Sequence, residues 1–265
     1  MAVLQALERE VVCSVPVDGP LLTSKGVRHK QTSMGALLTS TIRDCLQADV
    51  AMINGGTIKG NRDYNDGELN YLELQQELPF PTKMVVVRMP GNVLQDAISA
   101  SRAGKPEEEK RGFLQTDDGV AIDEAQAHTV LSVGGRQFNK DAVYNVALPR
   151  NLLKGIFDIR PLVDFANAHP EAMANEDAYV PAVNLILMHQ AKQIWRRLGD
   201  FDEIDLDGNQ QLDRDEIATA LEKRLGTKPS QILLDNVIRA IDTDHSGTID
   251  RDEYEKREKA PLHSP

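Results

Sequence analysis

Two twelve-residue segments near the end of the chain restrict its fold most strongly. Residues 205–216 read DLDGNQQLDRDE, and residues 242–253, which begin 37 positions later, read DTDHSGTIDRDE. Oxygen-bearing side chains recur at alternate positions in both segments, and each segment ends on glutamate. The segments could be two acidic turns that only cap neighbouring helices. The segments are, however, two complete copies of one pattern, and each follows an apolar helix. This favours a repeated structural unit in which both copies have the same function.

The spacing resembles the loop of the EF-hand, a helix–loop–helix unit that binds calcium. A hard cation takes six to eight oxygen ligands, supplied in this unit by positions 1, 3, 5, 7, 9 and 12 of the loop. The resemblance implies two Ca²⁺ sites, with a main-chain carbonyl at position 7 and a bidentate glutamate at position 12. The expected metal ligands are Asp205, Asp207, Asn209, the Gln211 carbonyl, Asp213 and Glu216 in the first loop, and Asp242, Asp244, Ser246, the Thr248 carbonyl, Asp250 and Glu253 in the second.

Differences between the two loops predict different affinities. Position 6 requires a positive φ, which is easy for Gly247 and costs Gln210 on the order of 1 kcal/mol. We therefore expect the first site to bind calcium more weakly. Leu212 and Ile249 at position 8 should pair across the two loops. The helix after the second loop is polar, with Tyr254, Arg257 and Glu258, and we expect it to fray or to need a partner.

Charge and composition agree with a cation site in this region. The 265 residues carry a net charge of −11, and residues 200–265 hold 17 acidic against 9 basic residues. A protein of this sign is not expected to bind nucleic acid. The two cysteines exclude a disulfide scaffold, and no apolar run is long enough to span a membrane. The first twelve residues lack the features of a secretion signal, so the default expectation is a cytoplasmic location.

The preceding residues predict a different kind of domain. Helical periodicity covers residues 34–46, with Thr32 or Ser33 as the cap, and further helices are expected at 92–103, 160–168 and 181–198. Short buried strands are expected at 50–53, 84–89 and 143–148. Such irregular alternation is typical of a mixed α/β domain. We place this domain at residues 1–195 and the calcium-binding unit at residues 196–265. The charged segment 105–111 (KPEEEKR) is interpreted as an exposed loop without a function.

Six segments in this first part resemble the C-terminal domain of the 5′-nucleotidase family of metallophosphoesterases. They are RHKQTSMGALL (28–38), ADVAMINGGTIK (48–59), LNYLELQQELPF (69–80), KMVVVRMPGNVLQDAI (83–98), GFLQT (112–116) and AVYNVALPRNLL (142–153). INGGTIK followed by LPF is the most specific part. The resemblance implies an α+β chain, in which a layered α/β/β/α domain of the nucleotidase C-terminal type precedes an all-α EF-hand pair.

The resemblance also implies a substrate pocket for a nucleotide or related phosphate ester. The asparagine of the family's NGGxIR motif falls on Asn54, and its arginine falls on Lys59. An upstream arginine falls on Arg28, with Lys30 as a second basic candidate. Phe80 falls on the aromatic residue that stacks on the base, and Phe157 is the candidate for the second aromatic wall. Each of these positions also has a structural alternative: a core position for Phe80, solvated charges for Arg28 and Lys59, and a required turn for Asn54.

The family's catalytic metals lie in a separate N-terminal domain, and none of its two-metal motifs occurs in this sequence. Two-metal hydrolysis needs ligands clustered about 4 Å apart, and the six histidines are scattered. Two functions therefore remain open. The chain is the substrate-binding part of a 5′-nucleotidase-like phosphohydrolase, completed by a catalytic metallophosphoesterase domain or chain. Alternatively, it is a calcium-regulated adaptor or sensor on a catalytically inactive nucleotidase scaffold.

Overall fold

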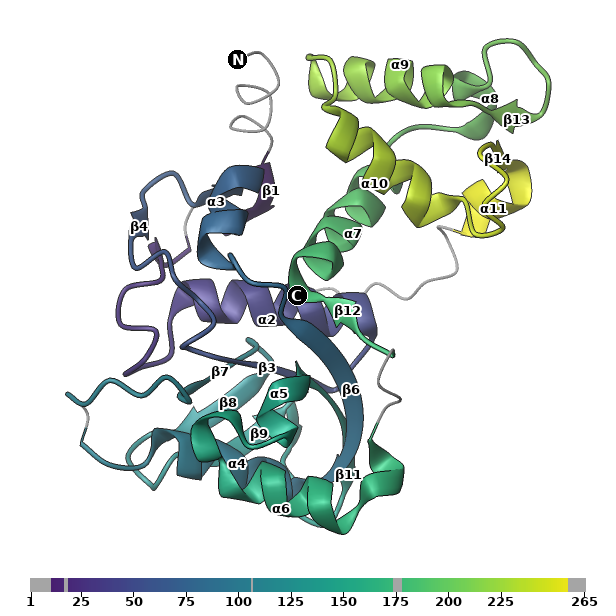
Figure 1. Cartoon of the computed structure of the whole chain (residues 1–265). Helices are drawn as coiled ribbons and strands as arrows, with labels where there is room; N and C mark the ends of the chain where they lie inside the picture. Colours follow the sequence, from purple (N-terminus) through teal and green to yellow (C-terminus); the bar gives the residue numbers. More distant parts are fainter. Residues whose placement is uncertain (1–10, 17–18, 106, 174–177, 257–265) are drawn as a thin grey trace. The chain divides into compact units, whose positions relative to one another are not determined.

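A computed structural model describes residues 11–16, 19–105, 107–173 and 178–256 (Figure 1). Internal contacts divide the chain into two compact units, one of residues 11–186 and one from Leu187 onward. The division falls within helix α7 (Ala182–Trp195). The domain boundary expected at residue 195 stays a prediction.

A five-stranded mixed sheet forms the centre of the first unit. Its strand order is β12-β6-β11-β3-β7, and only β3 and β11 run parallel. The strands are β12 (Val180–Pro181), β6 (Lys83–Pro90), β11 (Val143–Pro149), β3 (Val50–Asn54) and β7 (Leu114–Thr116).

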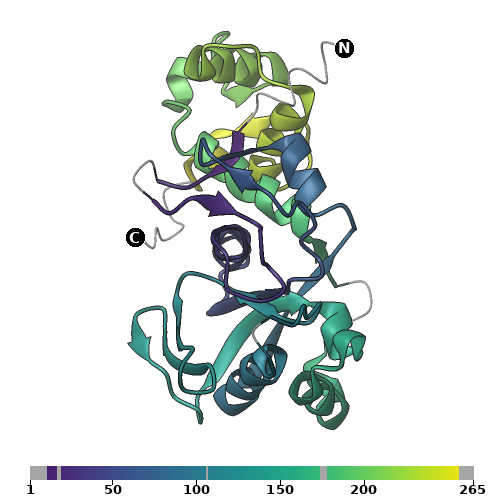
Figure 2. The same cartoon turned by 90° about the vertical axis from the view of Figure 1, so that its left-hand side faces the viewer.

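Helices cover both faces of this sheet. Figure 2 views α2 (Ser33–Leu46) end-on over one face and α4 (Gly91–Arg102) and α6 (Arg160–Ala168) over the other. Side chains alternate between the faces of a strand. Val50 and Met52 of β3 accordingly join the core formed with α4 and α6, whereas the equally buried Ala51 and Ile53 point to the α2 side. This two-sided burial explains why the sequence of β3 is uniformly apolar.

Smaller elements complete the first unit. A three-stranded sheet, β10-β9-β8, adds its apolar face to the same core as α4. Two short pairs, β1–β5 and β2–β4, lie in the first third of the chain. The remaining elements are β1 (Val11–Ser14), β2 (Leu22–Thr23), β4 (Asp63–Tyr64), β5 (Glu68–Asn70), α3 (Tyr71–Glu77), β8 (Val120–Asp123), β9 (Thr129–Val133), β10 (Arg136–Gln137), α5 (Arg150–Leu153), η1 (Ile156–Asp158) and η2 (Pro170–Ala172).

A buried ion pair fixes α2 to the strands that precede the candidate site. Arg43 Nη1 of α2 lies 2.6 Å from Asp117 Oδ1, whose side chain is fully buried. Asp117 Oδ2 accepts a 2.7 Å hydrogen bond from the main-chain N–H of Ala51 in β3. Removing one partner of such a pair leaves an uncompensated buried charge. The pair therefore holds β3, and the turn that follows it, in a fixed position.

The second unit consists of two helix–loop–helix segments. The first contains α8 (Phe201–Ile204), β13 (Gln211–Leu212) and α9 (Arg214–Leu225), and the second contains α10 (Gln231–Ile241), β14 (Ile249–Asp250) and α11 (Arg251–Glu255). Strands β13 and β14 are antiparallel and place Leu212 opposite Ile249, as the sequence predicted. No helix within the described ranges is long and apolar enough to cross a membrane.

Candidate functional site

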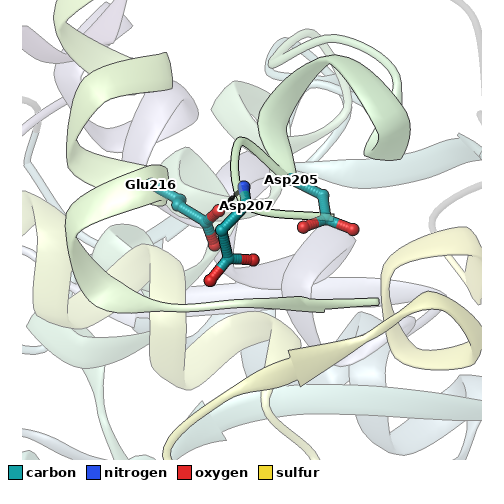
Figure 3. A group of neighbouring side chains, drawn as sticks. All are labelled: Asp205, Asp207 and Glu216. Carbon is teal, nitrogen blue, oxygen red and sulfur yellow. Dashed lines mark hydrogen bonds between the residues drawn. The ribbon is translucent and has the colours of Figure 1, made fainter. Parts of the chain in front are cut away.

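Three carboxylates of the first loop converge on one point. Asp205, Asp207 and Glu216 each direct a carboxylate oxygen into a space where these atoms lie within 4.8 Å of one another (Figure 3). Asp205 Oδ1 accepts hydrogen bonds from the N–H groups of Gly208 and Asn209, at 2.9 and 3.2 Å. Glu216 caps the start of α9 because its Oε2 accepts the Asp213 N–H at 2.9 Å. These bonds position the oxygens that a calcium ion requires before any ion arrives.

The second loop repeats this arrangement. The carboxylate oxygens of Asp242, Asp244 and Glu253 also lie within 4.8 Å of one another. Asp242 accepts the N–H groups of Ser246 and Gly247, each at 3.0 Å. Glu253 is 4% exposed, so one of the charged groups is almost fully removed from water. Clustered acids with little solvent repel one another, and a divalent cation relieves that repulsion.

The remaining expected ligands also lie in the two loops. Asn209 Oδ1 accepts the Gln211 N–H at 2.8 Å, and Ser246 Oγ donates to the Thr248 carbonyl at 2.9 Å. Asp213 and Asp250 are the N-caps of α9 and α11. Each of the twelve residues thus belongs to a curled loop with the predicted spacing. Coordination by each individual residue stays a prediction.

Backbone strain is shared between the loops rather than confined to the first. Position 6 has a positive φ in both, 67° at Gln210 and 87° at Gly247, as the sequence analysis expected. Position 4 also has a positive φ, 72° at Gly208 and 60° at His245. Each loop therefore places one non-glycine residue in the left-handed region. Strain alone does not make the first site weaker, and the predicted difference in affinity stays a prediction.

Two matched glycine substitutions test this symmetry. Gln210→Gly and His245→Gly should each relieve left-handed strain and stabilise the folded EF-hand pair by about 1 kcal/mol, because both positions already have a positive φ in the folded loops. Urea unfolding of each variant, followed by the fluorescence of Trp195, would measure both. A gain in only one variant would mean that the other position is not strained.

The turn after β3 gathers three distant segments of the first unit. A side-chain carbon on Gly55 would lie 2.2 Å from the Val27 carbonyl oxygen, and one on Gly56 would lie 2.8 Å from the Arg111 carbonyl oxygen. The N–H of Gly56 donates to that Arg111 carbonyl at 2.8 Å. Only glycine permits such close backbone approach. The glycine pair therefore lets the segments around residues 28 and 111 pack against the turn that leads to Lys59.

Three cations occupy this junction. Partial loss of solvent lowers the pKa of Lys59 below its usual range, and the positive charges of Arg28 and Arg111 lower it further. Arg28 Nη1 also lies 2.9 Å from Glu109 Oε2, an exposed carboxylate. Like charges held together raise the energy of the free protein. An anionic group that replaces Glu109 would relieve this repulsion.

The two predicted aromatic residues lie beside this group of cations. Phe80 is 61% exposed, with the Lys59 ammonium 5.8 Å from the centre of its ring. This exposure excludes the alternative that Phe80 is a core residue. Phe157 is 40% exposed and lines a cavity of about 240 Å³ together with Arg111. Both rings are accessible. That they form the two walls of one base pocket stays a prediction.

Asn54 and Lys30 occupy different surroundings. Asn54 is fully buried, and its amide donates to the Arg111 carbonyl at 3.1 Å while its Oδ1 accepts from Thr57 Oγ1 at 2.9 Å. In this arrangement Asn54 positions Arg111 and the turn. Lys30 is exposed, and its main-chain carbonyl accepts from Gln115 Nε2 at 2.6 Å. Direct contact of either residue with a substrate stays a prediction.

Arg111 is the residue that the sequence analysis missed. It ends the charged segment 105–111, which we interpreted as a loop without a function. In the structure it lowers the pKa of Lys59 and lines the cavity of Phe157, so it links the cations to the second aromatic residue. Its position directly before the family segment GFLQT was the available signal.

Protein-family models match parts of both units. Residues 11–156 match the model of the 5′-nucleotidase C-terminal domain, and residues 199–257 match that of the EF-hand domain pair. No curated protein matches the chain. Among solved structures, a 5′-nucleotidase precursor from Thermus thermophilus aligns with a TM-score of 0.51 at 18% identity, over 71% of this chain and 37% of that one. An NAD nucleotidase from Haemophilus influenzae aligns with a TM-score of 0.48 at 12% identity, over 68% and 35%.

The fold and the two loops define a layered α/β domain joined to an EF-hand pair, which confirms the predicted fold class. The chain belongs to the family of 5′-nucleotidase C-terminal domains, and its EF-hand pair makes it a calcium-binding protein. It spans little more than a third of the length of the solved structures that it matches.

Proposed function

We propose that residues 11–186 bind a nucleotide or a related phosphate ester, and that the EF-hand loops bind two calcium ions. Arg28, Lys59 and Arg111 hold the anionic part of the ligand, and the exposed ring of Phe80 stacks on the base. The convergence of three cations beside an exposed aromatic ring carries this proposal.

The chemistry of these side chains supports the assignment. Guanidinium groups bind phosphate oxygens through paired hydrogen bonds, and an ammonium acts as a point charge. An aromatic face accepts any base, with stacking worth about 1–3 kcal/mol. The cavity that Arg111 and Phe157 line offers space for part of the ligand next to Arg111. Together these groups match an anionic ligand with a flat ring.

We further propose that hydrolysis requires a metallophosphoesterase domain or chain beyond the residues described. The matched family model is that of a C-terminal domain, and the match to the Thermus thermophilus structure covers 37% of that chain. In this arrangement the first unit would position the substrate, and the other domain would supply the metal-ion chemistry of hydrolysis.

Calorimetric titration of AMP into the purified chain tests the binding proposal. We expect saturable binding, weakened about tenfold or more by Arg28→Gln, Lys59→Gln or Arg111→Gln, because each removes a charge-assisted contact. Phe80→Ala should cost about 1–3 kcal/mol. Lys25→Gln is the matched control, because Lys25 is a surface lysine paired with Asp63 rather than with this group.

Two results would contradict the proposal. One is the absence of AMP binding both with calcium and with a chelator. The other is equal affinity of the Lys25→Gln and Lys59→Gln variants. A difference in affinity between the calcium-loaded and calcium-free protein would demonstrate coupling between the two units.

The second candidate function is a calcium-regulated adaptor or sensor on an inactive nucleotidase scaffold. Lys59 favours it, since an ammonium stands where the family resemblance places an arginine. Capture of a protein from lysate with calcium, but not with chelator, together with no AMP binding, would support this function. Identical captures in both conditions would argue against it.

A further inference from the structure

A second cavity lies at the C-terminal end of α4. Its volume is about 400 Å³. The lining residues are Ser99, Ala100 and Arg102 at the end of α4, Ala103 and Gly104 directly after it, and Ala127 and His128 of the loop between β8 and β9. Arg28, Lys59 and Arg111, the cations of the proposed nucleotide site, do not line it. The cavity therefore needs its own explanation.

Arg102 is a buried cation that lines this cavity, and no carboxylate of the described residues forms an ion pair with it. It is 4% exposed, and its Nη2 donates to the Leu114 carbonyl and to Gln31 Oε1, each at 2.8 Å. Its Nε donates to the same carbonyl at 3.2 Å. The Arg102 guanidinium also lies over the Phe113 ring, with 4.8 Å between its central carbon and the ring centre. Burial lowers the pKa of Arg102 to about 10.

His128 adds a second unsatisfied group. Its Nδ1 is buried and has no hydrogen-bond partner among the described residues. Ala127 and His128 have φ values of 53° and 55°, in the left-handed region that is strained for non-glycine residues. Ser99 Oγ donates to the Ala127 carbonyl at 2.9 Å, and Gln95 Nε2 donates to the His128 carbonyl at 3.2 Å. Side chains of α4 thus hold this loop in a strained position against the cavity.

Charges of both signs border the cavity: a side-chain carbon on Gly104 would lie 2.9 Å from Lys110 Nζ and 3.8 Å from Glu108 Oε2. Lys110 donates through Nζ to the Arg102 carbonyl at 3.3 Å. Burial lowers the pKa of His128, and the charges of Arg102 and Lys110 lower it further, whereas Glu124 acts in the opposite direction. Glu124 is exposed and forms no ion pair with Arg102. A buried positive charge without a partner is costly. This cost falls when an anion enters the cavity.

We propose that this cavity binds a small oxyanion of the phosphate type, held by the Arg102 guanidinium and the His128 ring, which both line it. The volume exceeds that of phosphate alone. Ala100, Ala103 and Ala127 provide apolar walls, so a phosphate monoester with a small organic group also fits the chemistry. Ala100 lines both this cavity and the one shared by Arg111 and Phe157, but the charged lining residues of the two cavities differ, and the proposal does not rest on the proposed nucleotide site.

Titration of inorganic phosphate against matched potassium chloride, followed by NMR on the full chain, tests this proposal. We expect saturable shifts in the signals of residues 99–104 and 127–128. These shifts should persist in an Arg28→Gln, Lys59→Gln double variant, which removes cations of the nucleotide site. Phosphate and glycerol phosphate titrated in parallel would distinguish a free anion from an ester.

Two charge substitutions of opposite sign make the test specific. Ala103→Glu places a carboxylate beside Arg102 at an exposed position and should weaken phosphate binding about tenfold or more. Glu124→Gln removes the competing acid and should strengthen binding. Ala125→Glu, at an exposed alanine that does not line the cavity, is the matched control. The proposal is wrong if those signals do not respond, or if Ala103→Glu and Ala125→Glu bind phosphate equally.

Discussion

Replacing Glu216 and Glu253 together with glutamine should abolish the stabilisation of the EF-hand pair by calcium. Each glutamate supplies position 12 of its loop, is at most 7% exposed, and lies with two aspartates around one point. An ion that binds only the folded state stabilises it by about 2.7 kcal/mol per site at a free concentration of ~100 times Kd. Losing both sites should therefore remove about 5 kcal/mol of stability under those conditions.

Thermal unfolding of the full chain, with calcium and with chelator, measures this effect. The wild-type protein should unfold at a clearly higher temperature with calcium, and the double variant should unfold at the same temperature in both solutions. Asp215→Asn combined with Asp252→Asn is the matched control. It removes the same formal charge at the exposed position 11 of each loop, next to the two glutamates.

The control separates coordination from general acidity. If the control variant loses the calcium effect as completely as the glutamine variant, the loops would act only as a diffuse negative surface. If the glutamine variant keeps the full shift in unfolding temperature, position 12 does not coordinate the ion and the predicted ligand sets are wrong.

The calcium loops were predictable because all their ligands lie within twelve consecutive residues. Such a loop carries its own geometry, so spacing in the sequence translates directly into positions in space. The positive φ at Gln210 and the pairing of Leu212 with Ile249 followed from the same local pattern. The strain at His245 did not, because the sequence analysis considered only position 6 of each loop.

The basic group beside Phe80 was harder to predict, since its parts come from three separate segments. The family resemblance identified Arg28 and Lys59, but nothing in the segment 105–111 separates Arg111 from the charged residues around it. What unites them is the close backbone approach at Gly55 and Gly56. Contacts of this kind depend on the tertiary fold. In a single sequence the only visible sign of these backbone contacts is a pair of glycines after a strand.

The helix after the second loop was interpreted as polar, and the structure corrects this at one residue. Tyr254 is 1% exposed and belongs to the core of the EF-hand pair with Trp195 and Phe201. Arg257 and Glu258 lie outside the described residues. Tyrosine combines a large apolar body with one polar group, so it can be buried if its hydroxyl finds a partner. Here the hydroxyl donates to the Gly199 carbonyl at 2.8 Å.

Tyr254→Ala should therefore destabilise the EF-hand pair by about 3–5 kcal/mol, the usual cost of emptying a large aromatic site in a core. The Tyr254 ring meets Trp195 and Phe201 edge-on, at 6.0 and 5.7 Å between ring centres. Tyr254→Phe keeps these contacts and loses only the hydrogen bond, at about 1 kcal/mol. Trp195 is the single tryptophan of the chain, so its fluorescence during urea unfolding reports on this core. Equal stability of the two variants would mean that the helix after the second loop is not anchored by this ring.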